Sequence, residues 1–180
     1  MRVKVNKKIV LLAAMIVLAC FYGFRAYPRS IHAFIDLDNI ESMGILYRNY
    51  NAKSSDEKQY IINDRHEIEK VIEILNRYQY SKKLIQPDSV KSYAGDSVFI
   101  DIHFWGAGKV KKCSLAYAYG AAQEVNLSEK HSAQYHVGFF NKDADALFQE
   151  IYSYTRSLPS KTSLKNNFSE MIFAIDSNCT

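Results

Sequence analysis

The apolar run Ile9–Phe24 constrains this chain more than any other stretch. It holds sixteen residues without a charge, ends at Arg25, and follows four basic residues: Arg2, Lys4, Lys7 and Lys8. A helix that crosses a bilayer needs about 20 mostly apolar residues, with roughly 17 as the lower end. Cations that precede such a run keep the N-terminus in the cytoplasm. We therefore predict a single-pass cell-membrane protein, anchored through residues 9–24, with an extracytoplasmic C-terminal domain.

Three fates of this segment are compatible with its residues. It can stay as an uncleaved signal anchor, or a peptidase can cut after Ala19, which ends the tripeptide Val17–Ala19. The third fate is lipidation of Cys20, because Val-Leu-Ala-Cys is a loose version of the bacterial lipobox. Leu18 and the bulky residues after Cys20 are unusual for that motif. We favour the retained anchor, with lipidation second and secretion third.

The positive charge of the chain is concentrated at its start. The whole sequence has a net charge of +4, but residues 1–29 hold six Lys or Arg and no acid. Residues 30–180 therefore carry 17 cations and 19 anions, a net charge of −2. A nucleic-acid-binding domain concentrates cations on its folded part. We predict no nucleic-acid partner, and a folded domain because 13% of the residues are aromatic.

The cysteines predict neither a disulfide framework nor a metal site. The chain has three, Cys20, Cys113 and Cys179, and one of them lies in the apolar run. Cys113 lies in a predicted strand and Cys179 one residue from the end, so a free buried thiol at Cys113 is the predicted state. The spacing fits no zinc pattern. We predict no cofactor and no metal.

The first half of the domain predicts a hairpin followed by a helix. Glu41–Tyr50 and Lys58–Asn63 are predicted strands on either side of the polar turn Asn51–Glu57. Asp64 is a predicted N-cap, with Glu67 three residues later. The helix that follows has one apolar face, formed by Ile68, Val71, Ile72, Leu75 and Tyr78.

The second half predicts further strands. Ser97–Trp105 alternates apolar and polar residues, and the turn at Gly106–Gly108 leads into a partner strand, Lys109–Tyr119. Gln123–Leu127 is a weaker strand, and Gln134–Phe140 a clearer one.

Asn141 is the predicted cap of a last helix, Lys142–Arg156. Asp143 and Asp145 lie in its first turn, where carboxylates stabilise the positive end of the helix dipole. Its buried face is formed by Ala144, Leu147, Phe148, Ile151 and Tyr152.

These elements predict an α+β fold: an N-terminal membrane helix followed by an antiparallel sheet packed with two amphipathic helices. The predicted boundaries are a cytoplasmic stub and anchor over 1–29, an extracytoplasmic domain over 30–158 and a polar tail over 159–180. Within the domain, Ile31–Ile40 is interpreted as a short strand or an approach to the sheet.

The order of elements resembles that of small membrane- or lipid-anchored extracytoplasmic domains of unknown function from Gram-positive bacteria. The resemblance rests on the leader and on four apolar patterns: the strand around Ile45–Tyr47, the helix start at Asp64 running to Leu75, the strand Val98–Phe104 and the region Tyr135–Ile151. It covers most of residues 40–156. It implies a location in the cell envelope and says nothing about catalysis.

Asp101 and His103 are the only candidate catalytic residues. They lie two apart on a predicted strand and so on one face, with Phe99 and Trp105 beside them. A carboxylate that orients an imidazole can serve acid–base chemistry, but a row of polar residues is also the ordinary outer face of a half-buried sheet. The ordinary interpretation is preferred, because no nucleophile motif accompanies the pair. His136 could add a metal ligand only if three strand registers coincided.

The aromatic residues offer a second kind of site. Trp105, Tyr117 and Tyr119 are candidate binding residues on predicted strands, since Trp and Tyr are favoured at interfaces. The alternative is that they are ordinary core and rim residues.

Two functions remain compatible with the sequence. The first is a membrane-tethered, non-enzymatic binding or accessory domain for a protein, peptide or envelope polymer. The second is a small envelope hydrolase that uses the Asp101 and His103 face.

Overall fold

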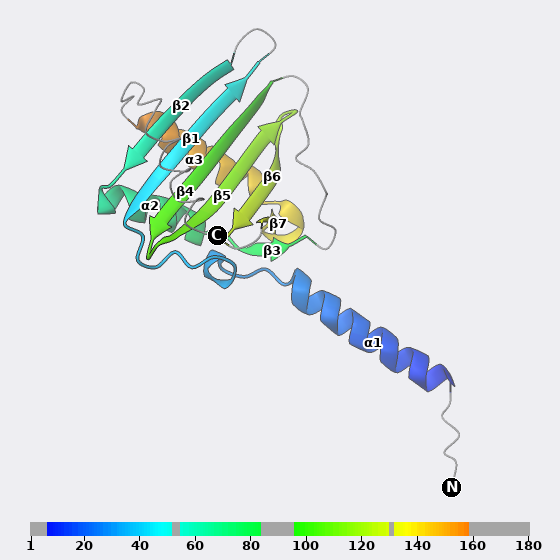
Figure 1. The fold of residues 1–180 in the computed structure, drawn as a ribbon. Helices are drawn as coiled ribbons and strands as arrows, with labels where there is room; N and C mark the ends of the chain where they lie inside the picture. The colour runs from blue at the N-terminus through cyan, green and yellow to red at the C-terminus, as the bar shows by residue number, and fades with distance from the viewer. Residues whose placement is uncertain (1–6, 52–54, 84–95, 130–131, 159–180) are drawn as a thin grey trace, which may run out of the picture.

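The computed structural model describes residues 7–51, 55–83, 96–129 and 132–158, and a seven-stranded antiparallel sheet dominates it (Figure 1). The strands follow one another across the sheet in the order β2-β1-β4-β5-β6-β7-β3. In chain order the elements are α1 (Lys7–Ala26), η1 (Ile31–Ala33), β1 (Ser42–Tyr50), β2 (Ser55–Ile62), α2 (Arg65–Asn76), β3 (Tyr80–Lys82), β4 (Ser97–Gly106), β5 (Lys109–Ala118), β6 (Ala121–Ser128), β7 (Ser132–Val137), η2 (Phe139–Asn141) and α3 (Ala144–Ser157).

Tight turns set the register at the centre of the sheet. Ala107 and Gly108 join β4 to β5 with φ of 51° and 70°, and Tyr119 and Gly120 join β5 to β6 with φ of 54° and 78°. Two successive positive φ angles are typical of the two-residue turns whose twist matches that of a hairpin. The predicted turn at Gly106–Gly108 is therefore confirmed. It fixes the pairing of Asp101 with Ser114 and of His103 with Lys112.

Helices α2 and α3 cover one face of the sheet, behind the strands in Figure 1. Asp64 caps α2 as predicted, because its carboxylate accepts hydrogen bonds from the backbone N–H groups of His66 and Glu67. The predicted cap of the last helix is wrong. Asp143 precedes α3, while the Asn141 side chain accepts a hydrogen bond from Val137 N at 3.0 Å.

Alternate residues of each central strand form the core beneath these helices. Ile45 of β1, Ile102 of β4 and Cys113 of β5 are neighbours in the register and are fully buried. Cys113 is a free thiol, as predicted. The aliphatic and aromatic side chains of α2 and α3 complete the core, so hydrophobic burial supplies the main stabilisation of this face.

The segment that precedes β1 is part of the core and not a strand. Ile31, Ile35 and Leu37 are at most 3% exposed, and the Ser30 hydroxyl accepts a hydrogen bond from His32 N at the start of η1. Just before it, Arg29 and Tyr80 exchange two backbone hydrogen bonds of 2.8 and 2.6 Å. The approach segment is thus fastened to β3 at the edge of the sheet.

A buried lysine ties the same segment to the middle of the sheet. Lys111 of β5 is 2% exposed on the helix-covered face, and its Nζ lies 3.2 Å from Asp36 Oδ2. Asp36 itself is largely exposed. A buried cation needs a partner, because an unpaired charge in a core is costly.

We expect Lys111→Met to keep or raise the urea midpoint of unfolding, since an apolar side chain of similar length removes the cost of burying a charge. Asp36→Ala is expected to lower the midpoint, because it leaves the Lys111 ammonium in the core without its carboxylate. Equilibrium urea unfolding of the two variants beside the wild type measures both. A lower midpoint for Lys111→Met than for Asp36→Ala would contradict this account.

The N-terminal helix corrects the predicted membrane anchor. Helix α1 spans 20 residues and projects away from the sheet (Figure 1). Its uncharged run Ile9–Phe24 measures only about 24 Å as a helix, against about 30 Å of bilayer hydrocarbon. Across the residues that the structure describes, no helix combines the length and the hydropathy that a bilayer crossing requires. The predicted transmembrane signal anchor and single-pass location are therefore wrong.

The predicted fold class is corrected in the same way. The described residues form an antiparallel seven-stranded sheet with three α-helices, and the first helix is not a membrane span. The connection predicted over Tyr80–Asp96 begins with the short strand β3. The predicted tail over 159–180 lies outside the described residues.

Candidate functional site

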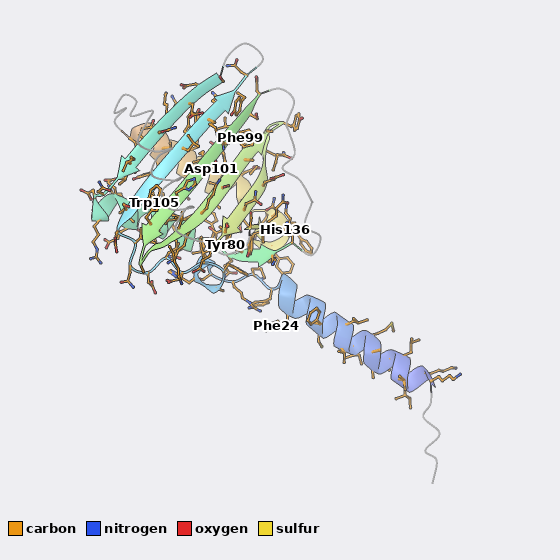
Figure 2. The ribbon with its side chains drawn as sticks, viewed as in Figure 1. Phe24, Tyr80, Phe99, Asp101, Trp105 and His136 are labelled. Atoms are coloured by element: carbon orange, nitrogen blue, oxygen red, sulfur yellow. The ribbon has the colours of Figure 1, made fainter. Side chains whose placement is uncertain are left out.

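The second face of the sheet carries no helix in the described part of the chain, and we call it the open face. The β-sheet register gives it every second residue of each strand. Figure 2 shows Phe99, Asp101 and Trp105 along β4 on this sheet. At its centre the open face includes Leu46, Arg48 and Tyr50 from β1, Glu57 and Gln59 from β2, Phe99, Asp101, His103 and Trp105 from β4, and Lys112 and Ser114 from β5.

Asp101 is the centre of the polar residues on the open face. The carboxylate is 5% exposed and forms an ion pair with Arg48 Nη2 from β1. Its other oxygen lies 3.3 Å from Lys112 Nζ of β5. Two cations from the two neighbouring strands therefore neutralise one buried carboxylate, and the three side chains tie β1, β4 and β5 together.

The pKa of Asp101 lies below its ordinary value. Burial alone raises it, but the charge of Lys112, a hydrogen bond from Ser114 and the charge of Arg48 together outweigh burial. Asp101 is therefore ionised at neutral pH. Because its oxygens bind cations, the carboxylate acts as a structural partner of Arg48 and Lys112.

His103 lies two residues along the same strand and is 8% exposed. Its ring stacks on that of Trp105, with centroids 6.0 Å apart and planes 19° from parallel. Burial lowers the pKa of His103 to about 4, aided by the nearby charges of Lys112 and Arg48 and opposed by Asp101. The imidazole is consequently neutral at pH 7.

Aromatic side chains border the polar centre. The Arg48 guanidinium lies 5.8 Å from the centroid of the Phe99 ring, and the Tyr50 ring meets the Phe99 ring edge-on at 5.8 Å. Tyr50 is 39% exposed, so this end of the open face offers aromatic surface to a partner. Arg and aromatic residues are enriched at the cores of protein interfaces.

The structure does not bring the three predicted binding residues together. Trp105 lies on the open face. Tyr117 lies on the opposite face, where its ring stacks on Phe148 of α3 with centroids 4.8 Å apart. Tyr119 is 69% exposed in the turn between β5 and β6. The aromatic residues beside Asp101 are instead Phe99 and Tyr50.

His136 shares the open face but not the site. The registers of β4 with β5 and of β5 with β6 put it three strands from β4, about 14 Å away (Figure 2). Among the described residues, no group of three or more His, Cys, Asp or Glu side chains could hold a metal ion. Cys20, the lipidation candidate, is an exposed free thiol within α1.

Sequence reasoning missed Arg48 and Lys112. Lys112 lies on the internal strand β5, where it reaches Asp101. A signal for Lys112 was present in the hairpin turn, which aligns it with His103. No signal in the sequence pointed to Arg48, because the pairing of β1 with β4 joins segments that are 53 residues apart at this ion pair.

Comparisons with models of known protein families, with curated proteins and with solved structures found no match.

Proposed function

We propose that this protein is a non-enzymatic binding or accessory domain that contacts its partner through the open face. The observation that carries the proposal is the composition of that face. An arginine, a lysine and a carboxylate are locked in ion pairs next to Phe99 and Tyr50, on the side of the sheet that α2 and α3 leave uncovered. A rigid face with aromatic and arginine side chains suits recognition by contact.

The state of the candidate catalytic pair supports binding over hydrolysis. A general base works best when its pKa lies near the operating pH, and burial holds that of His103 at about 4. The Asp101 carboxylate is engaged in ion pairs with Arg48 and Lys112 and is therefore a structural group in this arrangement. The hydrolase alternative requires a His103 pKa near neutral pH. Asp101 raises this pKa, but burial and the charges of Lys112 and Arg48 lower it by more.

Blocking the open face tests the proposal. The full chain, carrying a photo-crosslinker at Tyr50, is used to capture partners from cell extracts, and the same capture is repeated in the background of Ser128→Arg. Ser128 pairs with Lys112 on the open face, so the added arginine obstructs that surface without replacing a member of the ion pairs. We expect Ser128→Arg to reduce specific capture at least about tenfold.

The matched control is Gln149→Arg, which adds the same side chain to the exposed side of α3, on the other side of the sheet. It should leave capture unchanged. Equal capture by the wild type and both variants, with all three folded by circular dichroism, would show that the open face is not the contact surface.

A further inference from the structure

On the neighbouring strands β1 and β2, the open face holds a buried donor, Arg48 Nε, and a buried acceptor, Gln59 Oε1, neither with a hydrogen-bond partner among the residues that the structure describes. The Arg48 guanidinium is held at its other end by Asp101. The Gln59 amide is oriented by its own nitrogen, which donates to Glu57 Oε1 at 3.0 Å. Each atom is thus fixed in its role by a neighbour, and buried groups of this kind are rarely left unbonded.

The register places these two side chains next to each other. Arg48 pairs with Glu57, and Gln59 is two residues along β2 on the same face. Diagonal neighbours of this type are about 7–8 Å apart between backbones. A peptide group carries one acceptor and one donor, so it matches Arg48 Nε and Gln59 Oε1 in kind.

We propose that this donor and acceptor receive one peptide group of an extended segment, whose carbonyl oxygen accepts from Arg48 Nε and whose N–H donates to Gln59 Oε1. The inference rests on the proposed binding function and names its ligand class as peptide. Charge supports an uncharged group here, because the cations Arg48 and Lys112 are matched by the carboxylates of Asp101 and Glu57. The exposed Tyr50 ring and the Phe99 ring then flank the segment.

Both side chains keep exposed surface beside the two buried atoms. Arg48 keeps 32% of its side chain exposed, and Gln59 is a partly exposed residue of the edge strand β2. Rotamer changes of such side chains take picoseconds to nanoseconds. We expect rotation of the Gln59 side chain to admit the peptide group while the Arg48 guanidinium stays paired with Asp101.

The test uses the full chain and a minimal peptide group, N-methylacetamide, with the Arg48 Nε–Hε signal as the readout in a ¹H–¹⁵N NMR titration. The control ligand is N,N-dimethylacetamide, which accepts a hydrogen bond but cannot donate one. We expect a saturable shift with N-methylacetamide and binding at least about fivefold weaker with N,N-dimethylacetamide. Gln59→Leu should abolish this preference, whereas Gln134→Leu, the same change on the distant strand β7, should retain it.

A shift that does not saturate, equal binding of the two ligands, or a preference that survives Gln59→Leu would each overturn the inference. The Ser128→Arg capture experiment does not depend on these results. If that experiment supports the open face while the amide titration fails, the binding function stands and peptide is the wrong ligand class. If capture is indifferent to Ser128→Arg, the proposed function falls as well.

Discussion

Lowering the pH from 7.5 to 4.5 is expected to reduce the free energy of unfolding by about 2.5 kcal/mol through His103 alone. The unfolded chain protonates this histidine near pH 6.5, whereas the folded protein holds its pKa at about 4. Between these two values the unfolded state binds the proton and the folded state does not. Stability therefore falls as the pH drops through this window and is fully present above it.

Urea unfolding of the wild type and of His103→Gln at both pH values measures the effect. Glutamine does not titrate, so the variant should lose about 2.5 kcal/mol less than the wild type over the same pH change. The titration of Asp101 contributes little to the change in stability between pH 7.5 and 4.5. Its folded pKa is lowered, so the stability it contributes is lost only as the pH falls below about 3.8, the value for an unfolded aspartate. Equal losses in the two proteins would mean that His103 titrates normally in the folded state.

Removing both cations around Asp101 is expected to be the most destabilising change on the open face. Arg48→Ala combined with Lys112→Ala leaves a 5%-exposed carboxylate without a cation. Breaking a fully buried ion pair costs about 3–5 kcal/mol. Here Arg48 and Lys112 keep 32% and 38% of their side chains exposed, and solvent screening reduces the expected loss to about 2–3 kcal/mol at pH 7.

A third substitution separates charge from packing. Asp101→Asn in the doubly substituted background keeps the size of the side chain and removes the charge, so it should recover more than half of the lost stability. Unfolding in urea at pH 7, with unchanged dependence on urea concentration, is the measurement. If the triple variant is no more stable than the double variant, the lost contacts of the long side chains explain the effect and the buried charge does not.

The parts of the fold that depend on neighbours in sequence were predictable. The β4–β5 hairpin, its turn and the cap at Asp64 follow from alternation, glycine and a short polar side chain. The last predicted strand ended too late, because Gly138 adopts a φ of 69° and turns the chain before Phe139. No local pattern marks Ile31–Ile40 as core, because its burial depends on β3 and on Lys111, both distant in sequence.

The candidate site was predictable only in part, for the same reason. Alternation along one strand placed Asp101, His103, Phe99 and Trp105 on a common face. It could not show that Arg48 would reach Asp101, because that contact depends on β1 lying beside β4. Alternation along one strand does not separate Trp105 from Tyr117, but the register set by the turn at Gly106–Gly108 does. The sheet places them on opposite faces, since residues of β4 and β5 that pair directly share a face and Trp105 pairs with Val110.

Because Cys113 lies at the centre of the sheet, alkylation of its thiol can be used to measure unfolding of the sheet. Burial raises the pKa of this thiol to about 12, so at neutral pH it is both protonated and out of reach of alkylating reagents. It lies on β5, between β4 and β6, under the helices. A reagent reaches its sulfur only when those layers separate, so the alkylation rate of Cys113 measures how often the whole sheet comes apart.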